Sequence, residues 1–233
     1  MICFMFRKHI VVVLSFILAF GACGCSSLQS SVKDLVAGHL AGLPSQTRQA
    51  IIVEPLNHSN AKVTSWEFKD GHWQKVFLPM RAMVGRRGIA PLNEKREGDG
   101  RTPSGTYKLG LAFGYAPSIE TKLAYRQSTQ NDFWVDDVHS PQYNQWVVGK
   151  PNAESFEEMK RNDDLYKYGA VIEYNTRPIV PGHGSAIFMH IWRAPGKSTS
   201  GCVAFSPRSL RRLLAWLDVK QDPVILLIPA QGI

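Results

Sequence analysis

Apolar residues after position 30 occur in short runs separated by turn-forming residues, and this spacing constrains the fold more than any other feature. The runs at 51–53, 107–115, 186–191 and 224–228 are far shorter than the roughly 20 apolar residues of a membrane span. Short runs that end at Gly, Pro or Asp are typical of strands. The sequence therefore predicts a mainly β protein with a few helices (α+β) and excludes a multi-pass membrane protein.

Three segments between these runs carry further predictions. Residues 60–84 alternate in polarity around Asp70-Gly71, which indicates two strands joined by a hairpin turn. Residues 85–105 are rich in glycine and predict a long irregular connection, and such loops are usually functional. Residues 131–170 are polar, aromatic and poorly periodic. We expect a lid or insertion there, with short helical pieces around 154–166.

The clearest predicted helix covers residues 207–217. Ser206 is a favourable N-cap, and Pro207 suits the first helical position. Leucines follow at the i, i+3, i+4 and i+7 spacing that places them on one face of a helix, namely at Leu210, Leu213, Leu214 and Leu217.

The first 25 residues have the composition of a secretory signal peptide. A basic start at 7–9 precedes an apolar run at 10–20 and a group of small residues. Eleven residues span roughly 16 Å, about half of a bilayer core, which argues against a permanent anchor. Cys23 follows Phe-Gly-Ala and resembles the lipidated cysteine of a bacterial lipobox; Cys25 and ordinary cleavage are the alternatives.

These features predict how the chain is organised. We expect a signal peptide with a lipobox at 1–25, a tether with a short helix at 26–50 and a single folded domain at 51–233. The expected location is outside the cytoplasm, in the periplasm or cell envelope, with membrane anchoring through a lipid on Cys23.

Composition and charge narrow the classes of partner. A hydrophobic content of 44% and a charged content of 20% are ordinary for globular proteins and exclude a disordered chain. The formal net charge of +8 suits an anionic partner, but we expect no nucleic acid, because the protein is predicted to be exported. Asp136, Asp137 and His139 match no closed metal site, so we expect neither a metal nor another cofactor.

Cys202 is the only one of four cysteines that lies beyond the leader, which excludes a disulfide scaffold. A single cysteine in an exported protein is either a reactive thiol or a small buried apolar residue. His190 lies twelve positions earlier and can act as the base for a thiol, although a lone histidine can also be structural. If Cys202 is a nucleophile, we expect its pKa to lie well below the free value of about 8.5.

Two motifs resemble a known family. His190 followed by Ser-Gly-Cys-Val at 200–203 resembles the catalytic domain of the L,D-transpeptidase (YkuD-type) family. The segment GDGRTPSGTY at 98–107 is similar to the Thr-Pro-x-Gly-x-Tyr/Phe segment that this family carries upstream. WVDDVHSPQYNQWV at 134–147 and GSAIFMHIW at 184–192 look like the bacterial subgroup that lacks an arginine after Cys-Val. The resemblance covers about residues 51–228.

The resemblance implies a β-sandwich or barrel fold and acyl transfer on peptidoglycan stem peptides without a cofactor. Cys202 would attack the carbonyl of a diaminopimelate-type residue, with a terminal D-residue leaving, and His190 would be its base. Backbone N–H groups near Gly201 and Cys202 would stabilise the oxyanion. A hydrolase of the same fold and a non-catalytic wall-binding module remain the alternatives.

The sequence departs from the family pattern at two positions. Many members have histidine where this chain has Ser200, and many have arginine where it has Ala204. Arg193 or Arg101 would then hold the substrate, and we favour Arg193. Ser200 would contact the substrate. His183, in a Gly-His-Gly-Ser segment, would either belong to a loop that contacts the substrate and assist Cys202, or belong to a glycine turn before a strand.

Overall fold

The computed structural model describes residues 36–229, and the chain divides into two units, Met1–Gly42 and Leu43–Ile233. In the first unit, residues 36–41 are helical. The predicted signal peptide and Cys23 lie outside the described residues. No helix within residues 36–229 has the length and apolarity that crossing a membrane requires.

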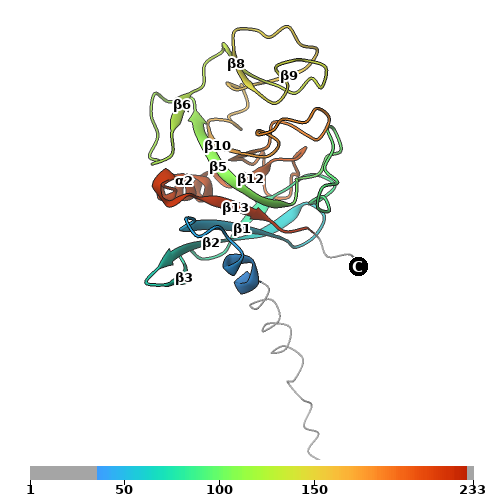
Figure 1. The fold of residues 1–233 in the computed structure, drawn as a ribbon. Coiled ribbons are helices and arrows are strands. Elements are labelled where there is room, and N and C mark those ends of the chain that lie inside the picture. Colours follow the sequence, from blue (N-terminus) through green and yellow to red (C-terminus); the bar gives the residue numbers. More distant parts are fainter. Residues whose placement is uncertain (1–35, 230–233) are drawn as a thin grey trace, which may run out of the picture. The chain divides into compact units, whose positions relative to one another are not determined.

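The second unit is built mainly from strands (Figure 1). Its elements in chain order are β1 (Gln49–Pro55), β2 (Asn60–Lys69), β3 (His72–Lys75), β4 (Met80–Met83), β5 (Gly105–Gly114), β6 (Tyr125–Gln127), β7 (Asp132–Val135), β8 (Trp146–Val148), β9 (Phe156–Glu158), β10 (Tyr168–Ile172), β11 (Phe188–Ile191), β12 (Val203–Phe205), α2 (Pro207–Trp216), the 3-10 helix η1 (Val219–Gln221) and β13 (Val224–Leu227).

The main sheet closes on itself. Its strand order is β1-β13-β5-β10-β11-β12-β4-β2, and β2 pairs back onto β1 over the whole length of β1. β3 extends β2, and β6 pairs with β5 outside this circuit. The predicted mainly β class is therefore confirmed, and the sheet is barrel-like. The interior is filled by apolar side chains, among them Ile51, Val63, Ile172, Met189 and Phe205.

The hairpin predicted around Asp70-Gly71 is confirmed. β2 and β3 pair in antiparallel register, with Lys69 opposite His72. Asp70 and Gly71 both have positive φ, 51° and 80°, which is the conformation that a two-residue hairpin turn requires.

Helix α2 supports the strand that carries His190. Ser206 Oγ accepts from the Ser209 N–H at 3.1 Å, and Pro207 occupies the first turn, as predicted. Leu210, Leu213 and Leu214 are buried in the main core, where each contributes about 1.5–3 kcal/mol by the hydrophobic effect. The helix packs against β10 and β11 and so supports β11, the strand that carries His190.

The prediction of helical pieces around 154–166 is wrong. Phe156 begins strand β9, which joins β7 and β8 in a separate three-stranded sheet. Phe156 packs edge-on against Phe133 of β7, with ring centroids 5.1 Å apart, and this contact between distant residues favours a strand. Asp163 then accepts from the backbone N–H of Leu165, a local bond that competes with helix formation.

Candidate active site

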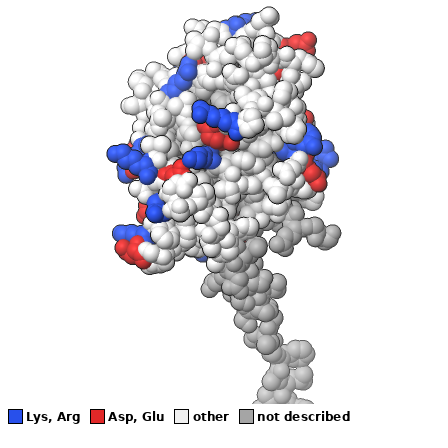
Figure 2. All heavy atoms as spheres, in the orientation of Figure 1, with Lys and Arg blue, Asp and Glu red and all other residues white. Residues whose placement is uncertain are grey.

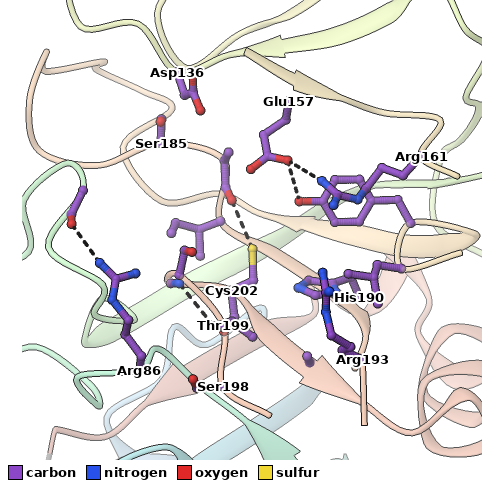
Figure 3. A pocket seen from close by; sticks show the side chains of 18 of the residues that line it. Arg86, Asp136, Glu157, Arg161, Ser185, His190, Arg193, Ser198, Thr199 and Cys202 are labelled. Carbon is purple, nitrogen blue, oxygen red and sulfur yellow. Dashed lines mark hydrogen bonds and ion pairs between the residues drawn. The ribbon is translucent and has the colours of Figure 1, made fainter. Parts of the chain in front are cut away.

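Cys202 and His190 are brought together by two neighbouring strands. β11 and β12 are parallel, with His190 opposite Ala204. Cys202 immediately precedes Val203, the first residue of β12, and it lines the same cavity as His190. Residues twelve positions apart in sequence are thereby brought into one site, as Figure 3 shows.

Both side chains line a cavity of about 530 Å³. Among the other residues predicted for the site, Ser200, Gly201 and Arg193 also line it. The cavity is large enough for part of a peptide, and Cys202, although only 9% exposed, forms part of its wall.

The Cys202 thiol is held by backbone groups. Its Sγ accepts from the Phe188 N–H at 3.4 Å, and the S–H donates to the Ala186 carbonyl at 3.2 Å. Burial raises the pKa of Cys202 to about 12. The expectation of a pKa well below 8.5 is therefore wrong, because removing the sulfur from water penalises the thiolate more than nearby donors favour it.

His190 is oriented by a backbone carbonyl. Its Nδ1 lies 2.7 Å from the Ile191 oxygen, and because a carbonyl can only accept, Nδ1 carries the proton. The lone pair is then on Nε2. Burial lowers the pKa of His190 to about 4, so the imidazole is neutral at pH 7. The described pair is a neutral thiol and a neutral imidazole, with no hydrogen bond between them.

The turn before Cys202 is tied together by Thr199. Thr199 Oγ1 donates to the Cys202 carbonyl at 2.7 Å and accepts from the Gly201 N–H at 3.1 Å. A Cβ at Gly201 would lie 3.1 Å from the Arg101 carbonyl oxygen and 3.1 Å from Ile187 Cδ1, so a larger residue would force one of them to move.

A residue from the glycine-rich loop also reaches this turn. Thr102 Oγ1 donates to the Cys202 carbonyl at 3.4 Å and accepts from the Gly85 N–H at 2.9 Å. The segment GDGRTPSG therefore contributes to the site by supporting the backbone of Cys202. The sequence singled out this segment but gave no sign of which residue in it contacts Cys202.

A family model matches residues 49–226, and its description is YkuD, the L,D-transpeptidase catalytic domain. The chain belongs to this family. Among solved structures, two of the helical cell shape determining protein Pgp2 from Campylobacter jejuni, one mutant and one unmutated, match with TM-scores of 0.45 and 0.43 at 16% and 15% identity. Each covers 86% of this chain, which spans only 56% of theirs. No curated protein sequence gives a significant match.

Within this YkuD-family domain, two predicted substrate contacts lie away from the cavity. The Arg101 guanidinium is 3.9 Å from Glu94, and its backbone N–H donates to Asp99, so the residue belongs to the structure of its own loop. His183 is exposed, and its carbonyl accepts from Tyr174 Oη at 2.5 Å. The Gly-His-Gly-Ser segment is seen here as a turn before β11.

The cavity contains charged residues from several parts of the chain. Asp136 and Glu157 lie on one side of Cys202 in Figure 3, and Arg86 and Arg193 lie on the other. Of these four, the sequence indicated only Arg193 as a substrate contact. Asp136 lies in the block 134–147 but pointed only to a metal that we do not expect, and no motif pointed to Glu157. Figure 2 shows Lys or Arg and Asp or Glu side chains intermixed on one face, without a single-sign patch there.

Proposed function

We propose that this protein is an exported cysteine acyltransferase that acts on peptidoglycan stem peptides. Membership of the YkuD family supports the substrate class. The observation that carries the proposal is that His190 of β11 and Cys202, which immediately precedes β12, lie in the wall of one cavity.

The proposed reaction starts from the neutral pair. The thiol turns from the Ala186 carbonyl toward His190, Sγ attacks the carbonyl carbon of the stem peptide, and Nε2 takes the sulfur's proton. The tetrahedral oxyanion collapses, the bond to the terminal D-residue breaks, and the proton passes from Nε2 to the leaving amine. The resulting thioester on Cys202 is then attacked by an amine of a second stem, which restores the thiol.

Backbone N–H groups around Cys202 are the proposed oxyanion donors. The N–H of Gly201 already donates to Thr199 Oγ1 at 3.1 Å. It can serve the oxyanion only by giving up that bond, so we assign the first role to the N–H of Cys202.

Arg193 and Arg86 are the proposed partners for a substrate carboxylate, in place of the arginine that is absent at Ala204. Arg193 contacts Asp163 at 3.6 Å with a side chain that is 68% exposed, and Arg86 donates to the Gly98 carbonyl at 3.4 Å. Both residues line the cavity, and within residues 36–229 neither forms an ion pair shorter than 3.6 Å. Ser200 lines the same wall and can donate a hydrogen bond to the substrate.

Two other functions would use the same fold. Water as the acceptor would make the protein an L,D-carboxypeptidase or endopeptidase. A non-catalytic wall-binding module is favoured by one observation, the burial that raises the pKa of Cys202 to about 12, since an inert thiol would show the same property.

The test is the intact mass of the protein after incubation with a tetrapeptide-stem muropeptide. We expect a mass gain equal to the mass of the muropeptide minus that of the released D-amino acid, and no such gain in Cys202→Ala. His190→Ala should slow turnover on the order of 10²- to 10⁴-fold. Products with and without an added acceptor amine separate transfer from hydrolysis. The absence of both adduct and product in the wild type would support the binding module.

We also propose that the chain is exported and lipidated at Cys23. The apolar run at 10–20 and the small residues before Cys23 support this proposal. Metabolic labelling with an alkyne fatty acid should mark the wild type and leave Cys23→Ser unmarked. Equal labelling of both proteins would contradict lipidation at this residue.

A further inference from the structure

Tyr166 packs directly against the imidazole of His190. The two rings meet edge to face, with centroids 5.3 Å apart and an interplanar angle of 73°. Tyr166 is 5% exposed and comes from the segment between β9 and β10, not from the strands that carry the Cys-His pair. The segment interpreted from sequence as an insertion thus contacts the proposed base.

Two polar groups hold the Tyr166 ring in this position. Its hydroxyl donates to Glu157 Oε2 at 3.2 Å. Arg161 donates to the same oxygen at 3.2 Å, and its guanidinium carbon lies 5.1 Å from the centre of the Tyr166 ring. The ring is therefore fixed at its hydroxyl and across one face.

Arg161 is itself restrained from the other side. It donates to both oxygens of Asp163, at 2.9 Å and 2.8 Å, and its backbone N–H donates to Tyr115 Oη at 3.0 Å. A side chain with this many partners is held in one conformation, which is suited to positioning another group.

The contact with Tyr166 complements the backbone contact of His190. The bond from Nδ1 to the Ile191 carbonyl restrains one atom of the imidazole but leaves the ring free to tilt about that bond. The edge of Tyr166 restricts this tilt and thereby the direction of the Nε2 lone pair.

We propose that Tyr166, held by Glu157 and Arg161, is a positioning residue that sets the orientation of His190 toward Cys202. This inference rests on the proposed function for its role in turnover. The orientation of His190 can nevertheless be measured without any substrate.

A purely structural role for Tyr166 makes a different prediction. The ring also packs on Phe113 and Phe188, at 5.9 Å and 5.7 Å, so its removal would destabilise the core in any case. Tyr166→Phe retains these contacts and removes only the bond to Glu157. Tyr166→Leu removes the ring, and Lys167→Gln is the matched control, because Lys167 is exposed on the same segment and pairs only with Asp164 among the described residues.

The groups that act on the charge of His190 include some from this segment. Arg161 lowers the pKa of His190 and Asp163 raises it, while the dominant effect is burial. The neutral Cys202 thiol lines the same cavity as the imidazole of His190. Loss of the Tyr166 ring would admit water, so the pKa of His190 should rise from about 4 toward 6.5 in Tyr166→Leu and change little in Tyr166→Phe.

The experiment uses the full-length protein with ¹⁵N-labelled histidine. NMR titration gives the pKa and the tautomer of His190. The rate of alkylation by iodoacetamide is followed on the peptide that contains Cys202. Turnover is measured on the muropeptide. In Tyr166→Leu we expect a raised pKa, a weaker Nδ1-H tautomer preference, and a kcat lower by about tenfold with little change in KM. Tyr166→Phe should lose about threefold in kcat.

The outcomes separate this inference from the proposed function. If wild-type protein shows no turnover while Tyr166→Leu still changes the tautomer and pKa of His190, the positioning role stands and the proposed function fails. If both Tyr166 variants leave the His190 titration, the alkylation rate and kcat at the level of Lys167→Gln, Tyr166 is only a core residue and the inference is overturned.

Discussion

The buried imidazole of His190 should make the stability of the protein depend on pH in a defined window. Its pKa is lowered from 6.5 to about 4 by burial. Between these values the unfolded chain binds a proton that the folded chain does not, so stability is complete above pH 6.5 and is lost as the pH falls toward 4. A tenfold change in a proton equilibrium is worth about 1.4 kcal/mol, which gives a loss of about 3 kcal/mol.

The assay is urea unfolding at a series of pH values from 4 to 7.5, with His190→Gln as the variant. The glutamine cannot titrate, so the difference in unfolding free energy between wild type and variant should change by about 3 kcal/mol across the window. Contributions from carboxylates and from the other histidines cancel in this difference. His183→Gln is the control, because His183 is exposed and its removal should leave the pH dependence of wild type intact.

A wild-type curve parallel to that of His190→Gln would refute the reasoning. It would mean that His190 titrates near its ordinary value, hence that the ring is hydrated or that a neighbouring charge compensates for its burial. The neutral thiol and imidazole from which the proposed reaction starts would then be the wrong starting state.

Three further predictions concern Cys202 and its turn. Because burial raises the pKa of Cys202 from 9.0 to about 12, the unfolding free energy that it contributes is lost as the pH rises from 9 toward 12. Buried tyrosines such as Tyr107 also have raised pKa values, so the measurement is the difference in unfolding free energy between wild type and Cys202→Ser, and a difference that stays constant over this range would contradict the prediction. Thr199→Val removes the bonds to the Cys202 carbonyl and from the Gly201 N–H, so urea unfolding should show a loss of about 1–3 kcal/mol. Gly201→Ala should cost about 1–3 kcal/mol through contact with Ile187, whereas a neutral result would show that the turn yields.

Local patterns in the sequence predicted the elements that local chemistry determines. Ser206 and Pro207 mark the start of α2, and the leucine spacing marks its buried face. Asp70-Gly71 marks the hairpin, because few other residues adopt two successive positive φ angles. The sequence also predicts the strand that carries His190, because residues 186–191 are apolar except for His190. In the structure, all four residues of β11 are buried.

Features that depend on distant contacts could not be predicted in this way. The strand β9 depends on the contact of Phe156 with Phe133, and no periodicity in 154–166 indicates it. The positions of Arg101 and His183 away from the cavity are set by their loops. The protonation states of Cys202 and His190 could not be predicted for a similar reason. Their spacing shows that the two residues can meet, but it does not show how much water surrounds them.

The Cys202 carbonyl accepts hydrogen bonds from two threonines, and this arrangement makes the site depend on two distant parts of the chain. One threonine belongs to the nucleophile's own turn, and the other, Thr102, comes from a loop a hundred residues earlier in the chain. Thr102 lies outside the named strands, so we expect that an insertion beside it would remove one of these two bonds without breaking the pairing of the main sheet. The glycine-rich loop is therefore a place where a local change can alter the Cys202 site while the fold persists.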